Sequence, residues 1–175
     1  SYTLVVTHEG SRTPDGARWA EAQRTVRVGN RSHYLHRFHG QRSLSDGEMR
    51  TVQYREYADG HALYRARPSG DDFAFDRVEL TRSRTADFFA HQTASYVERY
   101  LRDTNVTISQ VRIAGRPAYR LQVDEPPTGF ARASSGTEVS NYSVVAYVEW
   151  SGLVRSLDVA YTVDGRPVEF SFRYG

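Results

Sequence analysis

Cysteine and lysine are both absent from this 175-residue sequence, and methionine occurs once. Without cysteine the chain can form no disulfide, no thiolate metal site and no cysteine nucleophile. All 23 basic residues are therefore arginine, a composition typical of GC-rich genomes, and 21 acidic residues bring the formal net charge to +2. The arginines are interspersed with carboxylates rather than gathered in a dense stripe, which argues against nucleic-acid binding.

Long apolar runs are missing as well. No segment approaches the length of a membrane span, and the sequence contains no signal peptide. The chain opens and closes on strand-like segments, so we expect a mature domain with flanking segments removed. A chain of this length buries roughly 70% of its unfolded surface and needs no disulfide or metal to hold a core. We therefore expect one domain over 1–175.

Alternation of apolar and polar residues is the dominant pattern, and it is typical of strands with one buried face. The clearest runs are 153–163 and 168–174, joined by Asp164-Gly165, a strong signal of a tight hairpin. Weaker alternation predicts further strands at 1–8, 17–28, 31–39, 49–58, 61–67, 73–80, 106–113, 117–124 and 139–150. Many short strands at regular spacing predict a mainly β, antiparallel fold.

One segment departs from this pattern. Residues 85–102 place Phe89, Thr93, Tyr96 and Tyr100 at helical spacing. The change of period predicts one principal amphipathic helix with an aromatic face. We expect that face to lie on the concave side of a highly curved antiparallel sheet, or half-barrel, that wraps around the helix.

Motifs that carry catalysis or hold a cofactor are lacking: the sequence has no G-x-S-x-G, no H-E-x-x-H and no glycine-rich phosphate loop. On a strand, His33 and His39 share a face about 20 Å apart while His36 points the other way, so the three cannot chelate one metal. The carboxylate pairs Asp71-Asp72 and Asp124-Glu125 sit at predicted strand ends, where acids commonly serve turns and solubility. We expect no enzyme, no cofactor and no metal site.

Aromatic residues are abundant, with 12 Tyr, 8 Phe and 2 Trp. Two interpretations remain open: these rings fill a core, or some of them line a cavity between sheet and helix. Tyrosine suits a cavity because its ring packs on apolar ligands while its hydroxyl reaches water or a polar head. The loop 126–137, which contains Phe130, would gate such a cavity. The predicted lining set is Phe89, Tyr96, Tyr100, Phe130, Tyr147, Val159, Tyr161, Phe170 and Phe172.

Three N-glycosylation sequons begin at Asn30, Asn105 and Asn141. Asn30 and Asn105 fall at predicted turns, where an acceptor is accessible, whereas Asn141 lies early in a predicted strand. The sequons favour an extracellular or cell-surface location.

The strand-rich layout with one helix near its middle resembles the LolA-like superfamily of periplasmic and cell-surface lipoprotein carriers. Two segments are similar to its haloarchaeal surface lipoproteins: SYTL, which opens the chain at Ser1, and VEFSFRY, which covers 168–174. The arginine-only composition agrees with such an archaeal source, although haloarchaeal proteins are usually strongly acidic and this chain is nearly neutral.

The resemblance implies that a lipid or a lipoprotein acyl chain binds in the hollow of the half-barrel, without catalysis. It also implies an N-terminal helix, a Thr/Pro-rich tether and a lipid-anchored cysteine upstream of Ser1. We therefore expect an exported carrier of an apolar ligand. The alternative is a structural or interaction domain of a cell-surface protein with a filled core and no ligand.

Overall fold

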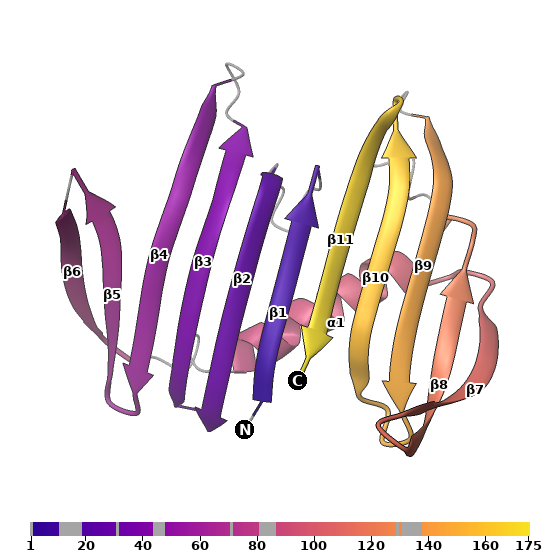
Figure 1. The fold of residues 1–175 in the computed structure, drawn as a ribbon, viewed down its shortest axis with the longest axis horizontal. Coiled ribbons are helices and arrows are strands. Elements are labelled where there is room, and N and C mark those ends of the chain that lie inside the picture. The colour runs from indigo at the N-terminus through magenta and orange to yellow at the C-terminus, as the bar shows by residue number, and fades with distance from the viewer. Residues whose placement is uncertain are drawn as a thin grey trace.

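The computed structural model describes residues 2–10, 19–30, 32–43, 48–70, 72–80, 87–128, 130 and 138–175. Eleven strands form one antiparallel sheet, and the described part contains one α-helix, α1 (Asp87–Leu101) (Figure 1). The strands are β1 (Tyr2–Glu9), β2 (Trp19–Asn30), β3 (His33–Ser43), β4 (Met49–Asp59), β5 (Ala62–Ser69), β6 (Asp72–Glu79), β7 (Thr107–Ile113), β8 (Arg116–Val123), β9 (Val139–Glu149), β10 (Val154–Val163) and β11 (Arg166–Tyr174).

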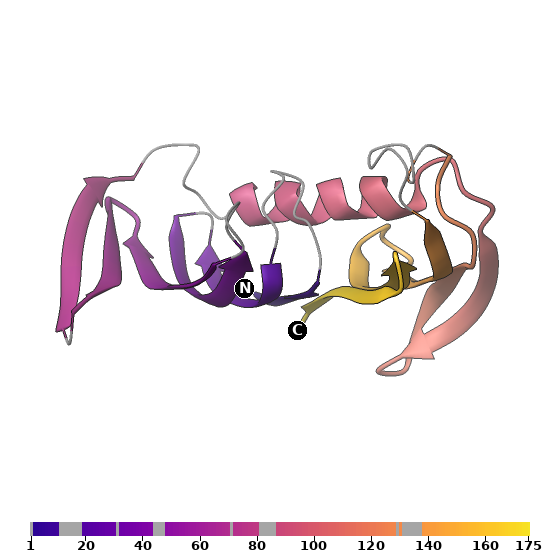
Figure 2. The same ribbon diagram turned by 90° about the horizontal axis from the view of Figure 1, so that it is seen from above.

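The strand order is β6-β5-β4-β3-β2-β1-β11-β10-β9-β8-β7. The first and last strands of the chain therefore pair at the centre of the sheet, with Leu4 opposite Tyr174 and Glu9 opposite Glu169. The chain passes from β6 to β7, which are opposite edges, so the connecting helix has to cross the sheet. Figure 2 shows α1 running along one face of a curved sheet that does not close into a barrel. This confirms the predicted mainly β chain with a curved antiparallel sheet.

Two hairpins of the sheet turn through pairs of residues with positive φ. Asp164 and Gly165 have φ of 48° and 76° between β10 and β11, and Ala114 and Gly115 have φ of 48° and 79° between β7 and β8. Such pairs are typical of the tight turns whose twist matches that of the flanking strands. The Asp-Gly signal thus fixes the register of the final hairpin, in which Val163 lies opposite Arg166.

One side of α1 is buried against the sheet and the other faces solvent. Phe89, Tyr96 and Tyr100 are buried, whereas Glu98 and Arg102 are exposed and form an ion pair of 2.9 Å. The helical spacing of the aromatic residues therefore correctly predicted an amphipathic helix with its aromatic side against the sheet.

The predicted elements differ from the observed ones mainly at their ends. β2 and β3 extend to Asn30 and Ser43, beyond the predicted ends at 28 and 39. The predicted strand at 153–163 begins one residue later in the structure, at Val154, and Leu153 is 44% exposed. The register of β10 against β9 also shifts between Val154 and Ser156. The start of the predicted helix at 85–86 and most of the loop 126–137 lie outside the described residues.

Candidate functional site

An aromatic cluster fills the space between the C-terminal half of α1 and the strands β10 and β11. Phe170 lies at its centre, with its ring centroid 4.2 Å from that of Tyr96 and 5.6 Å from that of Tyr100. The register places Val159 directly opposite Phe170, and alternation along both strands directs these side chains to the helix. The helix thus rests on rings rather than on the sheet backbone.

Phe130 covers the C-terminal end of this cluster. Its ring centroid lies 5.8 Å from that of Tyr100, 5.4 Å from that of Tyr142 and 5.3 Å from that of Tyr161. The Tyr142 hydroxyl donates a hydrogen bond of 2.9 Å to the Tyr100 carbonyl, which ties β9 to the helix. Burial raises the pKa of Tyr100, Tyr142 and Tyr161, so these hydroxyls remain neutral at physiological pH.

The structure brings most of the predicted lining residues together. Seven of them are buried in one core cluster, and half-buried Phe130 packs against it; the seven are Phe89, Tyr96, Tyr100, Val159, Tyr161, Phe170 and Phe172. Tyr147 is not part of this set. It lies opposite Ser156 and Arg120 and is half-buried on the other face of the sheet, because its neighbour Ala146 occupies the core position. That the clustered residues hold a ligand stays a prediction.

We expect Val159→Phe to lower the free energy of unfolding by about 1–3 kcal/mol, because Val159 is buried against Phe170 and extra carbons overpack a filled core. Urea denaturation measures the change. Unaltered stability would instead indicate that empty space adjoins Val159, as a permanent cavity requires.

A second cluster, which the sequence did not predict, lies beside the N-terminal half of the helix and is polar. His36 on β3 lies directly across from Glu56 on β4, and its Nδ1 is 3.0 Å from the Glu56 Oε2. Arg65 on β5 forms an ion pair with the same carboxylate. Arg24 on β2 donates a hydrogen bond to Gln92 on the helix. We call Arg24, His36, Glu56, Arg65 and Gln92 the polar cluster.

The aromatic rings of the neighbouring core enclose this polar cluster. The His36 ring centroid lies 5.0 Å from that of Phe89 and 5.2 Å from that of Tyr54, and the Arg65 guanidinium lies over the Tyr54 ring at 5.6 Å. His36 and Glu56 are consequently 2% and 7% exposed.

The charge states in the polar cluster follow from burial and hydrogen bonding. Burial lowers the pKa of His36, and the hydrogen bond to Glu56 only partly opposes this. Burial disfavours the Glu56 carboxylate, but hydrogen bonds from His36 and Arg65 outweigh burial and lower its pKa. At neutral pH, a neutral His36 therefore donates its Nδ1 hydrogen to an ionised Glu56, and the other ring nitrogen is an acceptor.

Two atoms of the polar cluster are buried and have no hydrogen-bond partner among the described residues. They are the Nε2 of His36, an acceptor, and the Nε of Arg24, a donor. Buried polar groups in proteins nearly always bind a partner or an ordered water. The polar cluster can therefore accept one hydrogen bond at the His36 Nε2 and donate one from the Arg24 Nε to a water molecule or another polar group.

Two further hydrogen bonds join the helix to the central strands. The Thr93 and Tyr174 hydroxyl oxygens are 2.7 Å apart, and the Tyr96 hydroxyl oxygen is 3.2 Å from the Nε2 of His8. Side-chain contacts of both kinds, rings and hydrogen bonds, thus hold α1 on the sheet.

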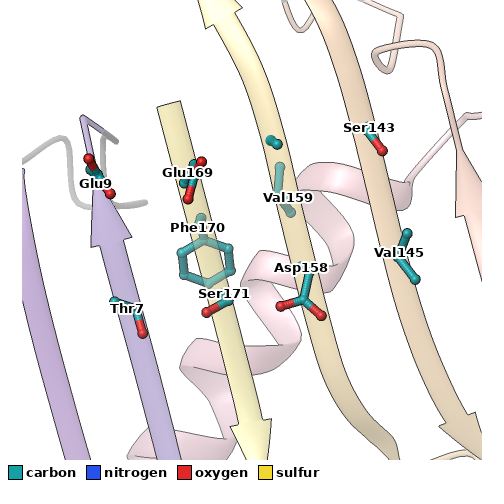
Figure 3. Close-up of a pocket in the computed structure, with 10 residues that line it drawn as sticks. Thr7, Glu9, Ser143, Val145, Asp158, Val159, Glu169, Phe170 and Ser171 are labelled. Carbon is teal, nitrogen blue, oxygen red and sulfur yellow. The ribbon is translucent and has the colours of Figure 1, made fainter. Parts of the chain in front are cut away.

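The face without the helix carries a shallow hollow of about 350 Å³ over β1, β9, β10 and β11 (Figure 3). Carboxylates and hydroxyls line it, among them Glu9, Asp158, Glu169 and Ser171. Val159 and Phe170 of the predicted lining set also border it, although the hollow opens on the face of the sheet that points away from the helix. Among the described residues there is no group of three or more histidine or acidic side chains that could hold a metal ion.

The sequon asparagines are all exposed. The Asn30 side-chain oxygen accepts hydrogen bonds of 3.0 Å from the backbone N–H groups of Ser32 and His33, which shapes the turn into β3. Asn105 lies between α1 and β7, and Asn141 has a φ of 53° where the β9–β10 register shifts. In the described residues, no helix is long and apolar enough to cross a membrane.

The architecture defines an open, curved antiparallel sheet with a single described helix laid across one face. No protein-family model matches the chain, and no curated protein sequence does. Among solved structures, the chain is similar to the crystal structure of LprF from Mycobacterium bovis, with 8% identity, a TM-score of 0.44 and coverage of 99% of this chain and 84% of that chain. This similarity concerns the overall fold and assigns neither a ligand nor an activity.

Proposed function

We propose that this domain is an exported, non-catalytic carrier that holds an apolar ligand, such as a lipid or a lipoprotein acyl chain, between α1 and the sheet. The observation that supports the proposal is the composition of that interface. The helix rests on a layer of aromatic rings, beside a buried polar cluster with an acceptor on His36 and a donor on Arg24. Apolar walls with a few polar groups are typical of ligand sites.

In the proposed mechanism the helix moves away from the sheet to admit the ligand. In the described structure, the lining residues touch one another, so a ligand has to replace helix–sheet ring contacts. The exchange conserves buried apolar area because an acyl chain takes the place of the rings of Tyr96 and Tyr100. As part of the same proposal, we place the domain in the LolA-like superfamily, in its haloarchaeal branch, with a lipid anchor upstream of Ser1. The SYTL and VEFSFRY segments and the arginine-only composition support this placement.

Locking the helix tests the carrier proposal. The chain has no cysteine, so Thr93→Cys on the helix with Tyr174→Cys on β11 supplies the only two thiols, at positions whose hydroxyl oxygens are 2.7 Å apart in the natural protein. We expect a short bis-maleimide that bridges them to abolish uptake of a fluorescent fatty acid. The same double variant capped with N-ethylmaleimide, which modifies both thiols without joining them, should retain uptake.

Native mass spectrometry of the unmodified protein completes the test by detecting co-purified lipid. If the locked and capped forms take up the probe equally, the ligand does not enter beneath the helix. If the unmodified domain binds neither probe nor lipid, the carrier proposal fails in favour of the structural one.

The ring-to-ring packing of Tyr96, Tyr100 and Phe170 is the observation that favours this second candidate, a cell-surface structural or interaction domain with a filled core.

The proposed export predicts glycans on Asn30 or Asn105, since both side chains are exposed outside strand interiors. Mass spectrometry of the protein from its native host, combined with protease treatment of intact cells, measures modification and location. A wholly cytosolic, unmodified protein would contradict the proposed location.

A further inference from the structure

The strand register gathers arginine and aromatic side chains on the face of β2–β6 that points away from the helix. One cross-strand row joins Arg27, Leu35, Tyr57, Tyr64 and Arg77 from β2 to β6. The next row joins Arg37, Arg55, Ala66 and Phe75 from β3 to β6. These residues are far apart in sequence, which is why the arginines do not form a stripe along the chain. We call Arg27, Arg37, Arg55, Arg77, Tyr57, Tyr64, Phe73 and Phe75 the arginine–aromatic face.

The four arginines of this face are exposed, and none of them forms an ion pair within the described residues. Arg37 and Arg55 lie directly opposite each other on neighbouring strands. Like charges in this position destabilise a sheet. An anionic partner that binds both would remove the repulsion.

The aromatic side chains of the face are unusually exposed for rings. Phe75 is 78% exposed, Phe73 44%, Tyr57 51% and Tyr64 39%. The two tyrosines stack on each other on β4 and β5, whereas both phenylalanines lie on the outermost strand, β6. Exposed apolar groups concentrated on one part of a surface mark an interaction site.

We propose that the arginine–aromatic face binds the surface of an anionic lipid membrane. Guanidinium groups pair with lipid phosphates, while tyrosine rings suit the headgroup region and phenylalanine the acyl boundary. Three of the four arginines and both tyrosines lie on the strands β2 to β5, whereas both phenylalanines lie on the edge strand β6 beside Arg77, so the apolar rings are concentrated at the edge of the face. A single-stranded nucleic acid would also bind arginine and stacked rings, but it gives no reason for phenylalanines on the edge strand.

The charge distribution of the same sheet face also orients the molecule. The carboxylates Glu9 and Glu169 lie over the strands β1 and β11, on the other half of this face, where Asp158 is paired with Arg173. An anionic surface attracts the arginine half and repels Glu9 and Glu169. The β4–β6 edge would therefore meet the membrane while the opposite half of the sheet stands away from it.

Flotation of the full chain with vesicles tests the proposal. We expect binding to vesicles of phosphatidylcholine with 30% phosphatidylglycerol, weakening as salt increases, and little binding to phosphatidylcholine alone. Each arginine near an anionic membrane contributes about five-fold to the partition coefficient, so Arg37→Gln with Arg55→Gln should reduce it about 25-fold. The matched control is Arg112→Gln with Arg116→Gln, which removes the same charge from exposed positions at the β7–β8 hairpin and should leave binding nearly unchanged.

The Arg37/Arg55 variant should still take up the fluorescent fatty acid, because both residues lie on the face without the helix. This measurement therefore separates membrane binding from the carrier function. Absence of binding to anionic vesicles, or an equal loss in both double variants, would overturn the proposal. So would a competing single-stranded oligonucleotide that binds more tightly than the vesicles and loses affinity in the Arg37/Arg55 variant. Light scattering that shows a dimer sensitive to Arg37→Gln and Arg55→Gln would assign the face to a second copy of the chain instead.

Discussion

Replacing Phe170 by alanine should lower the free energy of unfolding by about 3–5 kcal/mol, the range for removing a fully buried phenylalanine. Its side chain is 2% exposed and contacts the rings of His8, Tyr96 and Tyr100. Relaxation around the cavity is restricted because β11 is hydrogen-bonded to strands on both sides. A loss of this size approaches the total stability of a small domain. Urea denaturation followed by circular dichroism measures it.

Phe75→Ala is the matched control, because it removes the same side chain from a position that is 78% exposed on edge strand β6. We expect its effect to stay within about 0.5 kcal/mol. Equal losses for the two variants would contradict the placement of Phe170 at the centre of the helix–sheet core.

Local patterns in the sequence were sufficient to predict the two core surfaces. Alternation along 168–174 directs Phe170 and Phe172 to one face, and helical spacing does the same for Phe89 and Tyr96. Each of these patterns depends only on the geometry of its own element. Tyr147 shows the limit of this reasoning, since an aromatic residue on a strand can lie on either face until its cross-strand register is known.

The polar cluster and the arginine–aromatic face depend on which strands are neighbours. His36 alternates with Tyr34 and Phe38, and this pattern alone could have placed its side chain in the core. Its pairing with Glu56, however, follows from the β3–β4 register, and Arg65 joins them only through β5. Strand order cannot be read from composition or periodicity. For that reason the sequence predicted a ring-lined interface but not the charges beside it.

Acidification should destabilise the domain below about pH 6.5, and His36 is the first group responsible. Burial lowers the pKa of His36 from its ordinary value near 6.5, so the unfolded state takes up a proton before the folded state does. Stability is therefore full above pH 6.5 and falls as the pH drops toward the folded pKa, by at most about 1.4 kcal/mol per pH unit for one proton.

Two histidine variants measured by urea denaturation between pH 5 and 7 test the role of His36. His36→Gln should flatten the dependence in this window, because glutamine does not titrate. His39→Gln, at an exposed position on the same strand, should leave the dependence as it is. A slope that survives in His36→Gln would assign the titration to another group.

Glu56→Gln should destabilise the domain by about 3 kcal/mol at pH 7, the largest effect we expect from a polar substitution. The carboxylate is buried and binds both His36 and Arg65, and a neutral amide leaves a guanidinium in the core region without its counter-charge. The expected value lies at the low end for buried pairs because the Arg65 side chain is 33% exposed and water screens it. Glu98→Gln, in an exposed ion pair with Arg102, is the control and should cost less than about 0.5 kcal/mol.

The penalty of Glu56→Gln should also shrink in acid. Hydrogen bonds from His36 and Arg65 hold the pKa of Glu56 below its ordinary value near 4.5. The carboxylate therefore stabilises the folded state above that pH, and this contribution is lost as the pH falls through the folded pKa. Once Glu56 is protonated, the natural side chain and glutamine are nearly equivalent in charge and shape, so the two stability curves should converge. Curves that stay parallel down to the acid limit would show that the loss comes from altered packing rather than from the ion pair.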